Sequence, residues 1–205
     1  MGPCLKDIQQ PERVPAGGQG GSREARWVRS LASSGLLAAI SLVLALYVHF
    51  PLLPVAPYLL YDPSDIPVIL AGLWLGPGWV LPISAVVALA LGATAGGGAV
   101  GVVSRLVGSA ALGVAAAVAF HRGGRRIGFA GVVAVAAYTA AEVLLTLLLV
   151  PLFMGGSLDD AVALLLPVVV PFNLLKGGIN FALCSVIARQ LTKTPAGFSL
   201  GRRAD

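Results

Sequence analysis

The chain has 205 residues, of which 57% are hydrophobic and only 11% charged, and its formal net charge is +5. A typical soluble domain carries about 25% charged residues. The mean hydropathy of +0.89 therefore argues against a soluble globular enzyme and against a disordered protein. The apolar segments are long and continuous, which disfavours a transmembrane β-barrel. The composition is that of an all-α integral membrane protein.

The pattern along the chain predicts two tails around one membrane domain. Residues 1–30 are rich in Gly, Pro, Gln and charged residues, so we expect a disordered cytoplasmic tail there. Residues 31–192 form the membrane domain, and residues 193–205 form a C-terminal cytoplasmic tail. With ~20 apolar residues for each crossing, the pattern predicts six transmembrane helices. Their expected ranges are 31–49, 65–76, 78–94, 99–120, 127–150 and 171–191.

The last apolar region is longer than one span. Pro167 and Pro171 interrupt it, and a proline inside a helix removes a backbone hydrogen bond. We therefore expect a short interfacial helix before the sixth span.

The charges predict the orientation. Lys and Arg cluster in three places that six spans put on one side, namely the N-terminal tail, the loop with Arg122, Arg125 and Arg126, and the C-terminus. The opposite loops carry aspartates and neither Lys nor Arg. The positive-inside rule then places both termini in the cytoplasm. We expect a multi-pass protein of a prokaryotic plasma membrane.

Three ionisable residues remain inside apolar segments, and they are Arg105, Glu142 and Lys176. Each costs roughly 2.5–3.5 kcal/mol at a helix centre on insertion scales. All three lie toward the outer ends of their spans, so they can line one polar ligand pocket open to the outside. The alternative is a structural cluster in which Glu142 neutralises Arg105 or Lys176.

A proline-rich loop precedes the second span. Pro57, Pro63 and Pro67 stiffen it, and Ser64 or Asp65 can cap the helix that follows. Two tyrosines, Tyr58 and Tyr61, add flat aromatic faces with a polar tip. Such a rigid loop can cover a ligand, although an ordinary interfacial loop with a helix cap has the same composition.

The first span carries small residues four positions apart. They form the pairs Ser34 and Ala38, and Ser41 and Ala45. Small residues at this spacing let a second helix approach closely. That helix belongs either to the same bundle or to a separate membrane subunit that docks here.

Motifs for ATP hydrolysis, metal-dependent hydrolysis and a serine nucleophile are absent from the sequence. Active transport would therefore need a partner that supplies the energy. A membrane-embedded enzyme that uses Glu142 as acid/base and Arg105 as anion clamp is the less favoured alternative.

Two motifs carry a family resemblance. The first runs from Phe50 to Pro54 and from Asp62 to Pro67, followed by Gly76-Pro77, and the second runs from Pro171 to Gly178. Together they resemble the substrate-binding S components of energy-coupling factor (ECF) transporters, and the riboflavin-specific type in particular.

This resemblance implies a six-helix bundle that captures a vitamin from outside. Its partners would be a transmembrane coupling protein and two cytoplasmic ATPases, and riboflavin would be a transported ligand, with no cofactor or metal. Asn173 and Lys176 of the second motif would contact the ligand, and Ala38 and Ala45 would pack on the coupling protein. The full set of expected binding residues is Asn173, Lys176, Tyr58, Tyr61, Asp62, Asp65, Phe172, Thr146, Glu142 and Arg105.

The chain also departs from the riboflavin type. Residues 85–88 are wholly apolar where that type has a Lys-Asn pair, and Thr146 is the only polar residue where its fifth helix has an Asn. An S component for another vitamin or small metabolite is therefore the alternative.

Overall fold

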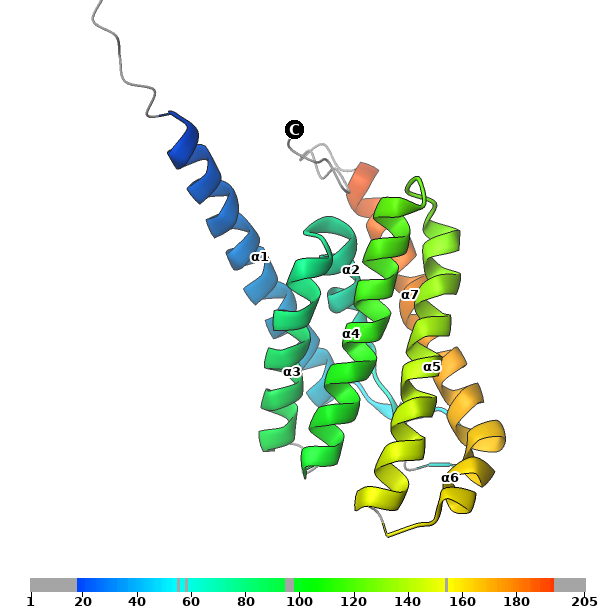
Figure 1. Cartoon of the computed structure of the whole chain (residues 1–205). Helices are drawn as coiled ribbons and strands as arrows, with labels where there is room; N and C mark the ends of the chain where they lie inside the picture. The colour runs from blue at the N-terminus through cyan, green and yellow to red at the C-terminus, as the bar shows by residue number, and fades with distance from the viewer. Residues whose placement is uncertain (1–17, 55, 58, 95–97, 154, 194–205) are drawn as a thin grey trace, which may run out of the picture.

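The computed structural model describes residues 18–193, apart from 55, 58, 95–97 and 154. These residues form a helical bundle in which α3, α4 and α5 lie side by side and α1 extends beyond one end (Figure 1). The elements in chain order are α1 (Gly18–Tyr47), β1 (Phe50–Pro51), β2 (Leu60–Tyr61), α2 (Asp65–Trp74), the 3₁₀ turn η1 (Pro77–Trp79), α3 (Val80–Thr94), α4 (Gly98–Arg122), α5 (Ile127–Phe153), α6 (Leu158–Leu164), the π-helical turn η2 (Leu165–Val169) and α7 (Val170–Lys193).

The first helix is longer than the sequence pattern predicted. It begins at Gly18 instead of residue 31, so the prediction of a disordered tail is wrong for residues 18–30. Residues 23–31 include Arg, Glu, Ala and Leu, which are good helix formers, and contain no proline or glycine. The helix therefore continues out of the bundle, past the ends of its neighbours (Figure 1).

The short helix α2 lies at the centre of the bundle. Nine of its ten residues are buried, and they pack with side chains of α1, α4 and α7 in the main core. Gly72 permits the closest approach, because a Cβ there would lie 2.8 Å from the carbonyl oxygen of Gly113 on α4. This packing holds the N-terminal end of α2, and the loop before it, at a fixed position between α4 and α7.

The last apolar region begins with a short capped helix, as predicted. Ser157 and Asp160 form a capping box at the start of α6, in which the Asp160 amide donates to Ser157 Oγ over 3.1 Å and the Ser157 amide donates to Asp160 Oδ2 over 2.8 Å. Pro167 then lies within η2, where the missing amide of proline breaks the α-helical ladder. The long helix α7 starts directly after this turn.

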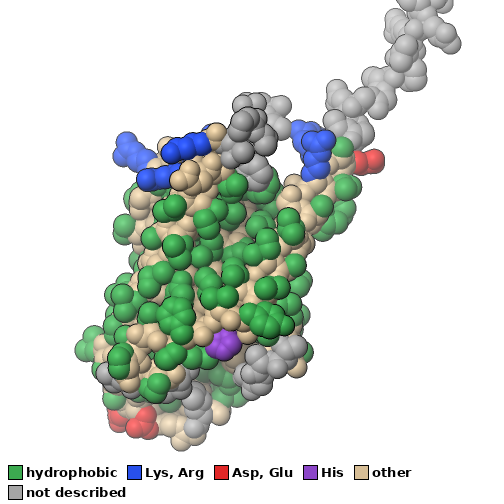
Figure 2. All heavy atoms as spheres, turned by 180° about the vertical axis from the view of Figure 1, so that it is seen from behind, with side chains coloured by type: hydrophobic (Ala, Val, Ile, Leu, Met, Phe, Trp, Pro, Cys, Tyr) green, Lys and Arg blue, Asp and Glu red, His purple; other side chains and the backbone are tan. Residues whose placement is uncertain are grey.

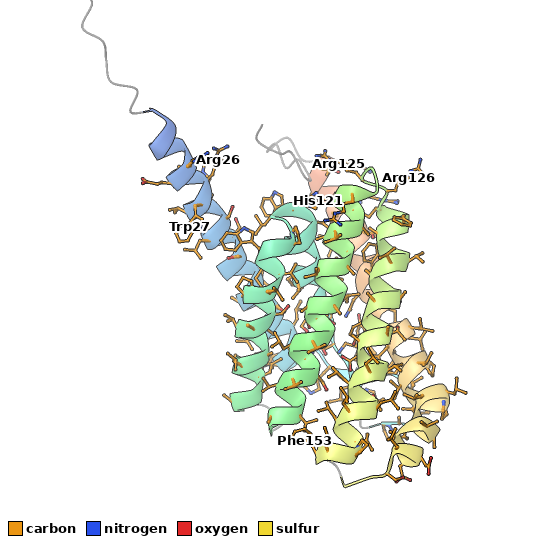
Figure 3. All side chains as sticks on the ribbon, viewed as in Figure 1. Arg26, Trp27, His121, Arg125, Arg126 and Phe153 are labelled. Atoms are coloured by element: carbon orange, nitrogen blue, oxygen red, sulfur yellow. The ribbon has the colours of Figure 1, made fainter. Side chains whose placement is uncertain are left out.

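The surface gathers its positive charge at one end and leaves the sides largely apolar. Figure 2 shows Lys and Arg side chains at one end with one acidic side chain beside them, further acidic side chains at the other end, and mostly hydrophobic side chains between. Arg125 and Arg126 lie at the opposite end of α5 from Phe153 (Figure 3). Within the described residues, four helical segments are long and apolar enough to cross a membrane, namely Arg23–Tyr47, Gly98–Arg122, Ile127–Phe153 and Leu158–Lys193.

The two other apolar helices are shorter. At 1.5 Å for each residue, the ten residues of α2 reach about half of a ~30 Å hydrocarbon layer. Because α2 is surrounded by other helices, its length does not have to match the bilayer.

Candidate ligand-binding site

A cavity of about 490 Å³ lies between α4, α5, η2 and α7, and Leu59 and Leu60 of the loop before α2 contribute to its rim. The helix segments around it belong to the half of the bundle away from Arg125 and Arg126. Its walls are mostly apolar, with a small number of polar groups, which is usual for small-molecule sites. The polar residues that line it are Asp65, Ser104, Arg105, Ser109, Tyr138, Glu142, Thr146, Asn173 and Lys176.

One wall is a stripe on α5. Tyr138, Glu142 and Thr146 follow each other at intervals of four residues, so they lie on one face of the helix, and all three line the cavity. Thr146 Oγ1 donates to the main-chain carbonyl of Glu142 over 2.8 Å. The stripe therefore offers the cavity a phenol, a carboxylate and a hydroxyl oxygen in a row.

Two glycines set the position of this stripe. A Cβ at Gly108 on α4 would overlap the Glu142 carboxylate and lie 2.9 Å from the Tyr138 ring. A Cβ at Gly177 on α7 would lie 3.0 Å from the same ring. Tyr138 thus packs closely between α4 and α7. Because Gly108 has no side chain, the Glu142 carboxylate has room to lie in the cavity wall.

A second wall comes from the start of α7. Phe172, Asn173 and Lys176 are buried and line the cavity. Asn173 Nδ2 donates to the carbonyl of Val169 over 2.8 Å, at the junction between η2 and α7. This bond fixes the amide and leaves its Oδ1 as an acceptor.

Asp62 joins the two cationic residues of the cavity. Its carboxylate accepts a bidentate pair of bonds from Arg105 on α4, at 2.8 and 2.9 Å, and a 2.9 Å bond from Lys176 Nζ on α7. Bidentate pairing of this kind is strong and directional. The loop before α2 is therefore tied to both helices by one buried carboxylate.

Ser64 donates two further hydrogen bonds to the Asp62 carboxylate. Its amide donates to Asp62 Oδ1 over 3.1 Å, and its hydroxyl donates to the same oxygen. Burial alone would raise the pKa of Asp62, but Lys176, Arg105 and Ser64 outweigh burial and hold that pKa below its ordinary value. Ser64 occupies the N-cap position of α2, one of the two positions predicted, but its side chain bonds to Asp62 and makes no capping bond to α2.

A second carboxylate, Asp65, is held by neutral donors. It accepts a 2.5 Å bond from Ser109 Oγ and a 3.2 Å bond from Asn180 Nδ2. Asn180 is fully buried, and its Oδ1 accepts a 2.9 Å bond from the Tyr61 hydroxyl. Asn180 also donates to the carbonyl of Asp62 over 3.2 Å, so it connects both aspartates to α7.

The structure brings most of the predicted binding residues together. Those that line the cavity are Asp65, Arg105, Glu142, Thr146, Phe172, Asn173 and Lys176. Asp62 does not line the cavity but is bonded to Arg105 and Lys176, which do. Tyr61 is bonded to Asn180, which lies outside the cavity wall, and Tyr58 lies outside the described residues. The predicted alternative in which Glu142 neutralises Arg105 or Lys176 is wrong, because both cations form their ion pairs with Asp62.

Sequence reasoning missed Ser109, Tyr138 and Asn180. None of them carries a charge at neutral pH, so none stood out within an apolar helix. A helical spacing signal existed for Asn180, since it follows Lys176 by four residues and Asn173 by seven.

The four small residues proposed for partner docking face the bundle. Ser34, Ala38 and Ser41 are buried, Ala45 is half-buried, and Ser41 Oγ donates to the carbonyl of Ser64 over 2.5 Å. The prediction that this stripe docks on a partner is therefore wrong. The stripe packs within the chain, which was the alternative.

The outward face of α1 carries other residues. Leu36, Ile40 and Val43 are exposed at 42–63%. Two small residues, Gly35 and Ala39, are exposed among them, and open space surrounds the Cα of Gly35 on the side where a Cβ would project.

Comparisons with known proteins bear on this architecture. The model of the family described as "ECF transporter, substrate-specific component" matches residues 29–188. A solved structure of the S component of a bacterial ECF transporter is similar with a TM-score of 0.68 and 23% sequence identity, over 82% of this chain and 97% of that chain. At this identity the likeness shows the fold alone. A comparison with curated proteins gives no match.

Proposed function

Since the chain belongs to the family of ECF transporter substrate-specific components, we propose that it captures a vitamin outside the cell and delivers it through an ECF module. The family is one of transport proteins and not of enzymes. The observation that carries the proposal is the cavity of about 490 Å³, with apolar walls and a few fixed polar groups. This is the form of site that binds a small organic molecule.

Riboflavin is the ligand that we propose first. The isoalloxazine ring is large, flat and apolar, with polar atoms at its edge. Phe172 and the aliphatic side chains of the cavity suit the ring, and Asn173 and Lys176 can bond to its edge or to a ribityl hydroxyl. The resemblance of the segments around Asp62 and Asn173 to the riboflavin-specific type supports this choice.

Another vitamin is the second candidate, and a specific observation favours it. Among the described residues, none of α3 lines the cavity, and residues 85–88 of that helix are apolar. In addition, the cavity contains Arg105 and Glu142, which are not part of the riboflavin-type motifs. The fold is therefore compatible with a ligand that carries a different set of polar groups.

We further propose six membrane helices with both termini in the cytoplasm of a prokaryotic cell. The clustering of Lys and Arg at one end of the molecule (Figure 2) supports this orientation. The cavity then lies in the outer half of the membrane, where it can receive a ligand from outside.

Transport would require a transmembrane coupling protein and two cytoplasmic ATPases. Their ATP hydrolysis would supply the energy for release of the ligand inside. We propose that the outward face of α1, with Gly35, Leu36, Ala39, Ile40 and Val43, docks on the coupling protein. An exposed apolar helix face with small residues permits close helix packing in a membrane.

Uptake of radiolabelled riboflavin tests this function. The chain is expressed with and without an ECF module in cells that lack other riboflavin uptake. We expect ATP-dependent accumulation only when both are present. Accumulation by the chain alone, or the same background uptake in all strains, would contradict the proposal.

A further inference from the structure

The polar groups of the cavity also indicate which chemical class of ligand it takes, if the chain has the capture function proposed above. We propose that Glu142 determines specificity by binding a nitrogen-bound hydrogen-bond donor of the ligand. Cationic donors are favoured over neutral ones, and anionic ligands are disfavoured.

The argument starts from the charges around the cavity. Two cations, Arg105 and Lys176, line it, and both are already paired with Asp62 at 2.8–2.9 Å. Because Asp62 and the nearby carboxylate of Asp65 together balance these two positive charges, the N–H groups that remain suit a neutral acceptor such as a carbonyl. An anionic group on the ligand would have to compete with Asp62.

Glu142 forms no such ion pair, although the charges of Lys176 and Arg105 lie near enough to act on it. It lines the cavity, and among the described residues no side chain or amide donates a hydrogen bond to its carboxylate. The other carboxylate that lines the cavity, Asp65, has Ser109 and Asn180 as donors. Glu142 is therefore the one carboxylate of the described cavity wall whose bonding capacity is left for a ligand.

The neighbouring groups add to this preference. Asn173 Oδ1 is an acceptor, and the bond to Val169 uses one of the two N–H groups of the same amide. An unpaired carboxylate in a mostly apolar cavity is costly, and a donor or positive charge at short range offsets that cost strongly in a site of low polarity. Glu142 and Asn173 Oδ1 thus favour a ligand that donates hydrogen bonds to them.

A panel of water-soluble vitamins, grouped by charge, tests the inference. Thiamine represents the cationic group, riboflavin and pyridoxine the neutral donors, and biotin, pantothenate and folate the anionic group. The full chain is purified in detergent, and dissociation constants are measured by calorimetry for the wild type, Glu142→Gln and Glu142→Leu. Asp159→Asn, which changes an exposed carboxylate at the end of the molecule nearer the cavity, is the matched control, and size-exclusion elution checks that each variant is folded.

We expect the tightest ligand of the wild type to be cationic or a neutral N–H donor. Glu142→Gln should weaken a cationic ligand by tenfold or more and a neutral donor by less, Glu142→Leu should weaken both further, and Asp159→Asn should change neither. Tightest binding of an anionic vitamin, or equal binding by the wild type and Glu142→Gln, would overturn the inference while the capture function stands. If no vitamin binds the wild type, the capture function itself is overturned, and the inference with it.

Discussion

Asp62 and Lys176 lie 114 positions apart in the chain, and Lys176 Nζ donates a 2.9 Å hydrogen bond to Asp62 Oδ2. The same carboxylate is bonded to Arg105. One loop residue therefore links α4 and α7, the two helices that form opposite sides of the cavity. We infer that this link holds the cavity in shape before a ligand enters.

Replacement of Asp62 tests the link. Asp62→Asn removes the one carboxylate that forms ion pairs with both buried cations, and removal of one partner from a buried ion pair typically costs about 3–5 kcal/mol. We expect a loss of that order in the free energy of unfolding, measured by chemical denaturation in detergent. Asp159→Asn, at an exposed position of α6, is the control and should change stability by less than about 1 kcal/mol. Equal stability of the wild type and Asp62→Asn would show that the link does not stabilise the fold.

The same variant has a predicted pH dependence. Since the folded state lowers the pKa of Asp62, its contribution to stability is present above the ordinary pKa of about 4 and is lost as the pH falls through the lower, folded value. The difference in unfolding free energy between the wild type and Asp62→Asn should therefore be constant from about pH 5 to 8 and shrink only below about pH 4. A difference that disappears near pH 7 would contradict this assignment.

Asn173 provides a test of the ligand site that leaves the ion pairs intact. Asn173→Ala removes the amide acceptor from the cavity, and the loss of one hydrogen bond is expected to weaken riboflavin binding roughly tenfold. Fluorescence quenching of riboflavin measures the change. Leu174→Ala, at the exposed neighbouring position, should bind like the wild type. Unchanged affinity of Asn173→Ala would remove this residue from the site.

Two adjacent alanines of α1 distinguish docking from internal packing. Ala39 is exposed, so Ala39→Trp should leave ligand binding intact and block ATP-dependent uptake by preventing close approach of the coupling protein. Ala38 is buried, so Ala38→Trp should overpack the core and lower stability by about 1–3 kcal/mol. Uptake by Ala39→Trp at the wild-type rate would show that this face does not dock.

The orientation is testable with single cysteines. In a background in which Cys4 and Cys184 are replaced by Ser, Arg126→Cys and Asp159→Cys place a thiol near opposite ends of the bundle. A membrane-impermeant maleimide should label Asp159→Cys in intact spheroplasts and Arg126→Cys only after lysis. Labelling of both positions from outside would contradict six spans, and the reverse pattern would contradict the orientation.

The sequence predicted the positions of the helices better than their contacts. Hydropathy and prolines locate α4, α5 and α7 to within a few residues, because length and apolar composition determine where a membrane helix can form. The structure also places Arg105, Glu142 and Lys176 around one cavity, as their depths suggested.

The pairing of these charges was not predictable from the helices. It depends on Asp62, whose position follows from the loop and from the packing of α2, and hydropathy periodicity carries no information about either. On α1 the stripe of small residues marked the inward face, but the sequence did not distinguish packing in the bundle from docking of a partner. From residue 36 to 47 its sequence is almost entirely apolar, so no polar stripe separates these two possibilities.

The most direct test of the central claim is a binding measurement on the purified full chain. The visible absorbance spectrum in detergent is recorded first, and riboflavin is then titrated with its fluorescence as readout. The account predicts either a yellow protein or saturable quenching at nanomolar to low-micromolar riboflavin, weakened by Asn173→Ala. A colourless protein that shows no quenching would contradict riboflavin as the ligand, and failure to bind any vitamin of the panel would contradict the capture function.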